Sequence, residues 1–423
     1  KLNVHYDYTL IVLVGLLVCF GLVMVASSSA YTAVKYDYGA TFFLERQGLM
    51  AAVGAVIMLF VSKFDYNNYI KAYSIRLSWI IEAAVFLGGS YLLFNKLGEN
   101  LTQYAVWQIV ILIVMGGISV LYTKLETNPK VIHVKFIVLL FYVCVLLQGL
   151  VMVIGASTNG STRWLNLPII GRFQPSELSK LCIVIFVAFI VNAKPTSLNS
   201  FRGFLKRLIG VIVLVALVVG ENLSTALIMI GIAFIVCFVA SRKWAYYFVS
   251  LIILVVAAIV GIFTVGYRAD RITQWLDVEN EGYQILQGLY AICSGGWFGK
   301  GLGNSVQKLG YIPEVHTDMI FSIICEELGI LGVIILLTVY IMLLWRIFKI
   351  AINAPNLFGS LVCVGSFAHI ALQLILNIAV VTNTLPSTGV TLPFISYGGT
   401  SLIVLLIEMG VVINISSQIE YDE

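Results

Sequence analysis

Apolar runs of about 20 residues recur along the whole 423-residue chain. A run of about 20 apolar residues is the length that an α-helix needs to cross the hydrocarbon core of a bilayer. Hydrophobic residues make up 60% of the chain and charged residues only 11%, whereas soluble proteins carry about 25% charged residues. Lipid leaves the backbone no external hydrogen-bond partner, so runs of this length must be helical. The sequence therefore predicts an all-α polytopic membrane protein whose partner is the lipid bilayer, with residues 1–423 as a single integral membrane domain.

We predict about twelve spans. An even number places both termini on one side of the membrane. The loops on that side carry more Lys and Arg than the opposite loops, so the positive-inside rule predicts that both termini are cytoplasmic. The first run ends in "ASSSAYTA", which loosely resembles a signal-peptide cleavage region, but we interpret it as an uncleaved first helix. The predicted spans are 8–29, 48–63, 77–95, 102–123, 132–155, 178–193, 203–219, 224–240, 244–266, 317–345, 358–382 and 399–419.

Several function classes are disfavoured by composition and by missing motifs. A net charge of +4 is small and scattered, so no nucleic-acid partner is expected. The chain lacks GxxxxGK[ST] and HExxH, which argues against ATP-driven transport and a zinc protease site. Its seven cysteines lie mostly inside apolar runs without a CxxC pair, so neither disulfides nor a protein metal site is expected.

The unusual loops all fall on the side that this orientation places outside. The loop over residues 267–316, between the ninth and tenth spans, is far longer than most connections, and such loops are usually functional. It mixes Arg268 and Lys300 with Asp277, Glu279 and Glu281. Its stretch "SGGWFGKGLGNS" is rich enough in glycine to let backbone amides approach an anion. Residues 267–316 are therefore the first candidate for a functional loop.

Another charged motif, "PSELSK", opens the sixth span. Glu177 and Lys180 are three residues apart and share a helix face. One interpretation is helix capping with an ion pair. The other is function, because ionisable groups at membrane depth usually face a cavity. By the same principle, at least one of Glu326 and Glu327 must face protein or water. For His316 in "HTD" we expect packing at a helix entrance rather than metal ligation.

Between the last two spans the chain runs "LPSTGVTLPFISYGGTS". This stretch is too polar for lipid and too apolar for a solvated linker. Irregular backbone at membrane depth persists only where it is buried in protein or lines a wet cavity. We therefore expect a turn whose Ser396, Tyr397, Gly398 and Gly399 line a substrate cavity, or alternatively a well-packed interhelical turn.

These motifs resemble a known family. "NGSTRWLNL…FQPSELSK", "GYQILQGLYAICSGGWFGKGLGNSVQKLGYIPEVHTDMIFSIICEELG" and "LPSTGVTLPFISYGGTS" are similar to the bacterial shape, elongation, division and sporulation (SEDS) proteins RodA, FtsW and SpoVE. The resemblance covers roughly 8–65 and 132–419. Family members usually have ten spans, so residues 72–130 look like an inserted helical pair that preserves the orientation of everything after it.

The resemblance implies a peptidoglycan glycosyltransferase of the bacterial cytoplasmic membrane with its active site facing outside. Such enzymes polymerise lipid II into glycan strands, for elongation, division or sporulation, usually beside a class B penicillin-binding protein that cross-links the strands. No resident cofactor is expected, although pyrophosphate chemistry often recruits a divalent cation such as Mg²⁺. The alternatives are a lipid II flippase and a non-catalytic scaffold of a cell-wall synthase.

The resemblance also implies site residues. The family's proposed catalytic acid lies five residues before the Gly of a "GYQ"-type motif, which here is Asp277. The usual Pro after it is Val278, so Glu279 and Glu281 remain alternatives. The family Arg at the outer start of the second span, which can pair with the acid, corresponds to Arg46. The remaining candidates for binding the substrate or ordering the loop are Arg163, Glu177, Lys180, Arg268, Lys300, Ser396, Tyr397, Gly398 and Gly399.

Overall fold

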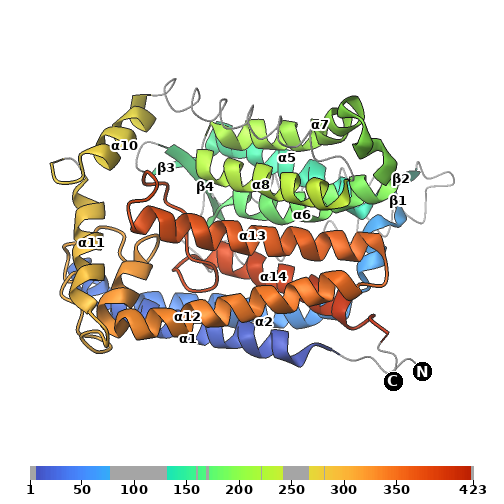
Figure 1. Cartoon of the computed structure of the whole chain (residues 1–423). Coiled ribbons are helices and arrows are strands. Elements are labelled where there is room, and N and C mark those ends of the chain that lie inside the picture. The colour runs from blue at the N-terminus through green and yellow to red at the C-terminus, as the bar shows by residue number, and fades with distance from the viewer. Residues whose placement is uncertain are drawn as a thin grey trace, which may run out of the picture.

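A computed structural model of the chain describes residues 6–76, 131–158, 161–167, 171–220, 222–241, 266–280 and 282–420. Long helices form one bundle, and two shorter helices cap one end of it (Figure 1). The bundle helices are α1 (Tyr8–Lys35), α2 (Phe42–Ser62), α5 (Phe136–Ile154), α6 (Pro175–Ala193), α7 (Phe201–Val219), α8 (Leu223–Ala240), α12 (Ile320–Asn353), α13 (Leu357–Val381) and α14 (Gly399–Ser416). The capping helices are α10 (Gly266–Leu276) and α11 (Tyr283–Gly295).

Seven of the described helices are long and apolar enough to cross a membrane, namely α1, α2, α6, α8, α12, α13 and α14. Shorter apolar helices cover Phe136–Met152 and Leu208–Val219, in α5 and α7. These nine helices coincide with nine predicted spans. The predicted spans 77–95 and 102–123, and almost all of 244–266, lie outside the described residues, so the total of twelve stays a prediction.

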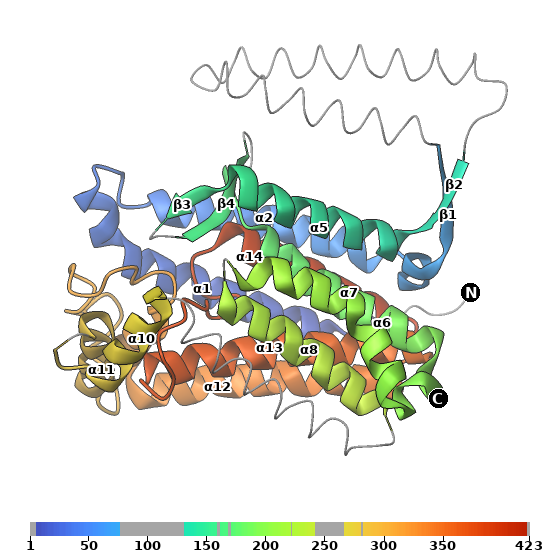
Figure 2. The same ribbon diagram turned by 90° about the horizontal axis from the view of Figure 1, so that it is seen from above.

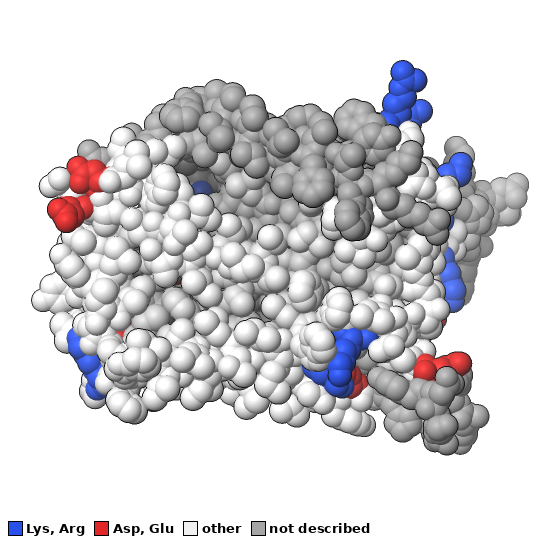
Figure 3. Space-filling model, in the orientation of Figure 1, with Lys and Arg blue, Asp and Glu red and all other residues white. Residues whose placement is uncertain are grey.

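The outside of the bundle is apolar. Large side chains such as Val56 and Phe60 on α2, or Ile335 and Ile341 on α12, are between 65% and 72% exposed. On the visible face the charged side chains gather toward the two ends, and the central band carries almost none (Figure 3). Exposed apolar surface of this extent is not stable in water, and it suits contact with lipid.

Helix α14 lies at the centre of the bundle and is buried along most of its length. It packs closely on α2, where a Cβ added to Gly410 would lie 2.7 Å from the carbonyl oxygen of Met58. Small residues allow helix backbones in membranes to approach, which strengthens their van der Waals contact. The core of the molecule is thus built around the last predicted span.

Short strands complete the fold. Strands β3 (Ala156–Thr158), β4 (Ser161–Leu167) and β5 (Gly171–Phe173) form an antiparallel sheet in the order β3-β4-β5, where the sequence predicted only a loop. Strands β1 (Ala72–Arg76) and β2 (Val131–Lys135) pair antiparallel with Arg76 opposite Val131. The two ends of the predicted inserted pair therefore lie side by side. Single-turn helices η1 (Tyr66–Ile70) and η2 (Pro195–Asn199) occupy two further connections.

Both termini lie at one end of the bundle and α10 and α11 at the other, in both views (Figures 1 and 2). We call these the terminal end and the loop end. At the terminal end, Arg346 on α12 forms an ion pair of 2.6 Å with Asp7 before α1. The placement agrees with the even number of spans, and which end faces the cytoplasm stays a prediction from the Lys and Arg distribution.

Candidate functional site at the loop end of the bundle

Residues 382–398 form the irregular connection between α13 and α14, which we call the 382–398 segment. It folds back into the bundle rather than projecting from it, and Leu392, Phe394 and Ile395 are at most 3% exposed. Phe394 has a positive φ of 63°, which is uncommon for a bulky residue. A Cβ on Gly21 of α1 would lie 2.7 Å from the carbonyl oxygen of Phe394, so α1 can pack on this turn only through a glycine. The apolar residues of the segment are therefore core residues.

Polar contacts connect the 382–398 segment to most of the helices around it. Gln47 on α2 donates to the carbonyl of Ser396 (3.2 Å) and accepts from the amide of Gly398 (3.2 Å). Asn377 on α13 donates to the carbonyl of Val390 (2.7 Å). Ser224 on α8 donates to Thr388, and Tyr340 on α12 donates to Pro393. Buried backbone groups need such partners, and here the partners also fix the position of the segment.

The predicted catalytic residue Asp277 follows the last residue of α10. Two contacts hold α10 on the 382–398 segment: Arg271 donates to the carbonyl of Ser387 (2.9 Å), and the Trp275 indole donates to the carbonyl of Asn383 (3.0 Å). The Asp277 carboxylate is exposed, and the side-chain amide nitrogen of Asn280 donates to both of its oxygens at 3.0 Å. Asp277 thus lies at the end of an anchored helix, with its carboxylate oxygens exposed.

Arg46, the predicted partner of Asp277, lies in the first turns of α2. Its guanidinium sits 4.4 Å from the centre of the Phe42 ring and hydrogen-bonds the hydroxyl of Tyr397. In the described part of the chain, Arg46 and Asp277 form no ion pair with each other. Burial raises the pKa of Tyr397, while Arg46 and Arg172 oppose that shift. Arg46, Arg172 and Tyr397 therefore form a cationic, hydroxyl-bearing cluster at the loop end.

His316 is part of the same cluster and packs as expected. Its ring lies 4.5 Å from Phe43 and 5.4 Å from Tyr397, centre to centre. Burial lowers the pKa of His316 to about 4. Nearby, burial is the main cause that raises the pKa of Asp318 to about 6, and Glu314 adds to the shift while Arg271 opposes it. Asp318 is thus a partly buried carboxyl at the loop end with a raised pKa, and the sequence interpretation did not select it.

The glycine-rich stretch and the two residues after it surround an anion, and that anion is the protein's own carboxylate: the stretch contributes side chains, and the backbone amides come from Val306 and Gln307. The side chain of Glu326 is fully buried and forms an ion pair of 2.6 Å with Lys300. It also accepts the hydroxyl of Ser305 and the amides of Val306 (3.1 Å) and Gln307 (3.3 Å). Lys300, predicted to bind substrate or order the loop, therefore orders the loop in this structure.

The neighbouring Glu327 ties the loop to α1. Its buried carboxylate accepts from Lys308 (2.8 Å) and from the hydroxyl of Ser27 (2.7 and 2.8 Å). Helix α12 breaks directly afterwards at Gly329, whose φ of 64° and ψ of −170° are not helical, and the amides of Lys300 and Gly301 bond the carbonyls of Glu326 and Glu327 (2.9 and 3.0 Å). Both glutamates thus face protein rather than lipid, as intramembrane charge requires.

Glu177 and Lys180 form the predicted ion pair at 3.0 Å in the first turns of α6. Both are buried, with exposed fractions of 7% and 2%. The hydroxyl of Ser401 bonds Glu177, and Lys180 donates to Gln373 on α13 (2.8 Å). Neither side chain is open to solvent in this structure, so the pair joins α6 to α13 and α14.

The other predicted residues are distributed as follows. Ser396 is 6% exposed and its hydroxyl accepts the amide of Leu392 (2.8 Å), so it stabilises the turn instead of offering a free hydroxyl. Gly398 and Gly399 are half-buried beside Tyr397, and Arg163 is half-buried on β4. Arg268 belongs to α10, but its side chain, like all of Glu281, lies outside the described residues. Glu279 is exposed two residues after Asp277.

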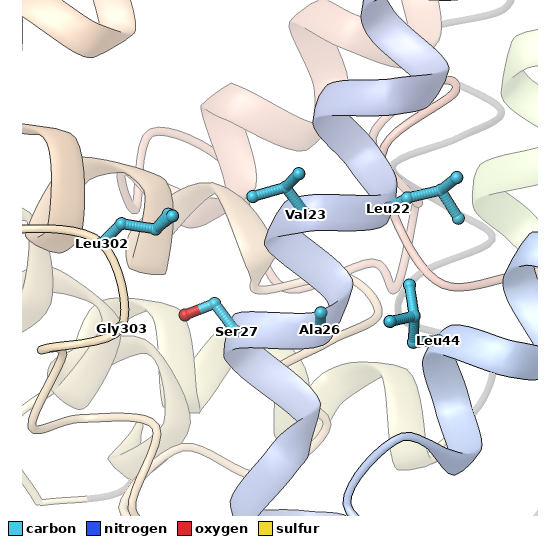
Figure 4. Close-up of a pocket in the computed structure, with 7 residues that line it drawn as sticks. All are labelled: Leu22, Val23, Ala26, Ser27, Leu44, Leu302 and Gly303. Atoms are coloured by element: carbon cyan, nitrogen blue, oxygen red, sulfur yellow. The ribbon is translucent and has the colours of Figure 1, made fainter.

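A cavity of about 410 Å³ opens beside Ser27, and its lining comes from α1, the start of α2 and the glycine-rich loop (Figure 4). The lining is apolar except for the Ser27 hydroxyl, which is engaged with Glu327. Such a wall suits a hydrocarbon chain better than a sugar. The cavity is lined by Leu22, Val23, Ala26, Ser27, Leu44, Leu302 and Gly303.

Across the described ranges, no three His, Cys, Asp or Glu side chains are grouped as they would be around a metal ion.

Comparison with known proteins gives the same family as the motifs. The FtsW/RodA/SpoVE family model, described as "Cell cycle protein", matches residues 7–90 and 73–421. The chain is 35% identical over 426 residues to stage V sporulation protein E of Bacillus subtilis strain 168, covering 98% of both chains. It is 31% identical over 419 residues to the probable peptidoglycan glycosyltransferase FtsW of Geobacter sp. strain M18, covering 98% of this chain and 97% of that relative.

Solved structures share the fold. One is a chain in a structure described as "Structural coordination of polymerization and crosslinking by a peptidoglycan synthase complex". Its TM-score is 0.69, and the match covers 99% of both chains. Another is the rod shape determining protein RodA of Thermus thermophilus, with a TM-score of 0.60 and the same coverage. Identity is 23% in both cases. On the full-length match and the shared bundle, this chain belongs to the SEDS family of FtsW, RodA and SpoVE proteins.

Proposed function

We propose that this protein polymerises lipid II into glycan strands on the outer face of the bacterial cytoplasmic membrane, for elongation, division or sporulation. The observation that carries the proposal is the position of Asp277 directly after α10. Arg271 and Trp275 anchor this helix to the 382–398 segment, at the end of the bundle that also holds Arg46 and Arg172. Relatives over the full length are named probable peptidoglycan glycosyltransferases, which supports the same reaction class.

The proposed reaction is an inverting glycosyl transfer. The acceptor 4-hydroxyl attacks the anomeric carbon of the donor, the new C–O bond forms, and the bond from that carbon to the pyrophosphate oxygen breaks. The hydroxyl proton passes to the Asp277 carboxylate, and such general-base help is typically worth about 10²–10⁴-fold. The polyprenyl pyrophosphate leaves as an anion, and Arg46 and Arg172 are placed to compensate its charge.

We also propose that Arg46 pairs with Asp277 once substrate is bound and keeps that carboxylate ionised. It does not touch Asp277 in this structure, and catalytic contacts often tighten only in the complex with substrate.

A class B penicillin-binding protein is the proposed partner, because one structural neighbour belongs to a peptidoglycan synthase complex. The apolar cavity beside Ser27 is a candidate for the polyprenyl chain. Residues 267–316 act in this proposal as the extracellular catalytic loop.

Asp277→Asn tests the proposal in a lipid II polymerisation assay with purified protein in detergent. We expect activity to fall by at least about 10²-fold with unchanged thermal stability, because the carboxylate is exposed. Glu279→Gln is the matched control and should polymerise normally. Full activity in Asp277→Asn would transfer the role of base to Glu279 or Glu281.

The same assay separates the alternatives. Flipping has no meaning without two leaflets, so a flippase would show no polymer in detergent. A scaffold would show none either, and Asp277→Asn would then alter partner binding alone.

A further inference from the structure

A chain of five buried polar side chains crosses the interior of the bundle, from the start of α6 through α13 to the middle of α14. Lys180 lies 3.0 Å from Glu177 and donates to the Gln373 side-chain oxygen at 2.8 Å. His369 Nε2 lies 3.1 Å from the same oxygen, and its Nδ1 lies 2.7 Å from Glu408. None of the five is more than 7% exposed. Ionisable groups at this depth are costly and usually functional. A continuous chain that holds four of them therefore calls for a role.

The donors and acceptors of this chain settle the orientation of Gln373. An ammonium group can only donate, so the atom of Gln373 that faces Lys180 must be the carbonyl oxygen Oε1. That oxygen can only accept, so the His369 Nε2 beside it must carry a hydrogen. The amide orientation and the histidine tautomer therefore follow from the chemistry of the neighbours.

The other half of the Gln373 amide is aimed at the 382–398 segment. Its NH₂ group donates to the carbonyl oxygen of Thr391 (3.0 Å) and to the Thr391 hydroxyl (3.1 Å). If the amide were flipped, its oxygen would face the Thr391 carbonyl and its hydrogens would face the Lys180 ammonium, so the hydrogen bonds to both of these groups would be lost. Lys180 and His369 thus hold Gln373 in the one orientation that binds the segment.

Glu408 completes the arrangement by holding the imidazole. Because His369 Nε2 is a donor, the Nδ1–Glu408 contact holds one proton, and the pair is either imidazolium with carboxylate or imidazole with carboxylic acid. Both forms are neutral overall, and the Glu177–Lys180 pair is neutral as well. The chain therefore places four ionisable groups inside the bundle without net charge, which costs less than burying a charge without a partner.

We propose that Gln373 is a positioning residue for the lipid II cavity, and that His369 and Glu408 lock its amide. Through Thr391 it holds the 382–398 segment, which carries Tyr397, Gly398 and the anchor points of α10. The role in catalysis rests on the proposed function, whereas the role in holding the segment does not. His369 and Glu408 act on the loop end entirely through Gln373, without touching substrate.

Gln373→Met tests the role in catalysis, since Met keeps the length of the side chain and removes its hydrogen bonds. In the polymerisation assay we expect the KM for lipid II to rise about tenfold, with kcat changed much less, because the segment carries Tyr397 and Gly398, which are predicted to line the substrate cavity. Thr391→Val removes only the hydroxyl acceptor and should act in the same direction more weakly. The two changes combined should be no worse than Gln373→Met alone.

Two variants separate this role from simple destabilisation. Glu408→Gln can still donate to His369 Nδ1 and should leave KM as in wild type, whereas Glu408→Leu, which leaves His369 unlocked, should raise it. Ser366→Ala removes a buried hydroxyl from α13 that makes no hydrogen bond, and is the matched control. An unchanged KM in folded Gln373→Met, or a KM rise of equal size in Ser366→Ala, would overturn the proposal.

A structural readout keeps the test independent of enzyme activity. Cys19 and Cys293 are the exposed cysteines, so Ser387→Cys in a Cys19→Ser, Cys293→Ser background gives a thiol on the segment itself. Its modification by a water-soluble maleimide should become about tenfold faster with Gln373→Met and stay unchanged with Glu408→Gln. Equal rates in all three proteins would overturn the proposal. Protection that depends on Gln373 in a protein without polymerase activity would overturn only the proposed function.

Discussion

At the scale of single residues, two neighbours at the loop end have pKa values moved in opposite directions. Burial between Phe43 and Tyr397 lowers the pKa of His316 to about 4. Burial also raises the pKa of Asp318 to about 6. Both shifts favour the neutral form, because the low-dielectric surroundings penalise whichever state is charged.

These shifts predict opposite contributions to stability with pH. His316 binds a proton more readily when unfolded, so its contribution rises as pH increases from about 4 to 6.5, by at most about 3 kcal/mol. Asp318 binds a proton more readily when folded, so its contribution falls between about pH 4 and 6. His316→Phe should therefore remove a gain in melting temperature on raising pH, and Asp318→Asn should remove a loss.

Thermal unfolding in detergent at several pH values measures both effects as differences from wild type. Taking differences cancels the titration of all other groups. If the melting temperatures of His316→Phe and wild type change in parallel between pH 4 and 6.5, the assignment of a neutral, buried His316 is wrong.

At the scale of elements, the glycine-rich loop is attached to the break in α12 by two ion pairs of different burial. The Lys308 side chain is 10% exposed and pairs with Glu327, whereas the Lys300 side chain is 34% exposed and pairs with Glu326. Glu326 keeps the Ser305 hydroxyl and two amides if Lys300 is lost. Glu327 has fewer other donors.

Lys308→Met should therefore be the more harmful change. Breaking a buried pair leaves an uncompensated charge and costs about 3–5 kcal/mol, whereas Lys300→Met should cost clearly less. Melting temperatures of the two variants, compared under one detergent condition, provide the measurement. Equal losses would mean that burial does not decide the strength of these pairs. A higher KM for lipid II in Lys300→Met would instead support the predicted contact between Lys300 and the substrate.

At the scale of the whole molecule, the strand pair β1–β2 makes the predicted insertion separable. Arg76 and Val131 lie opposite each other, so a two-residue Asn-Gly turn can join them as a hairpin. A variant that lacks residues 77–130 and carries this turn should insert with unchanged orientation, because an even number of predicted spans is removed. We also expect it to polymerise lipid II.

Accessibility of Cys293 to a membrane-impermeant maleimide in intact cells measures the orientation of the shortened chain, since this cysteine is exposed at the loop end. The full-length protein is the control. Cys293 modified in the full-length protein but protected in a stably expressed shortened variant would show that residues 77–130 set the topology.

Most of the fold at the level of helices could be predicted from the sequence. Nine predicted spans correspond to helices, because a run of apolar residues in lipid has to satisfy its backbone locally. Errors at the ends are largest for α1 and α12, which continue to Lys35 and Asn353, and for α2, which begins already at Phe42. The strands around residue 165 were missed, since short antiparallel pairs depend on which residues meet rather than on a local pattern.

The sequence by itself determined the membrane class, the family and the set of charged residues that the loop end contains. Only the tertiary structure decided how these residues are used. Lys300 meets Glu326 and Arg46 meets Tyr397, while His369, which the sequence interpretation had left in an unrelated segment, joins Lys180 through Gln373. Helical spans follow from interactions within a few residues, but each of these pairings joins groups that are distant in the chain, and packing alone brings them together.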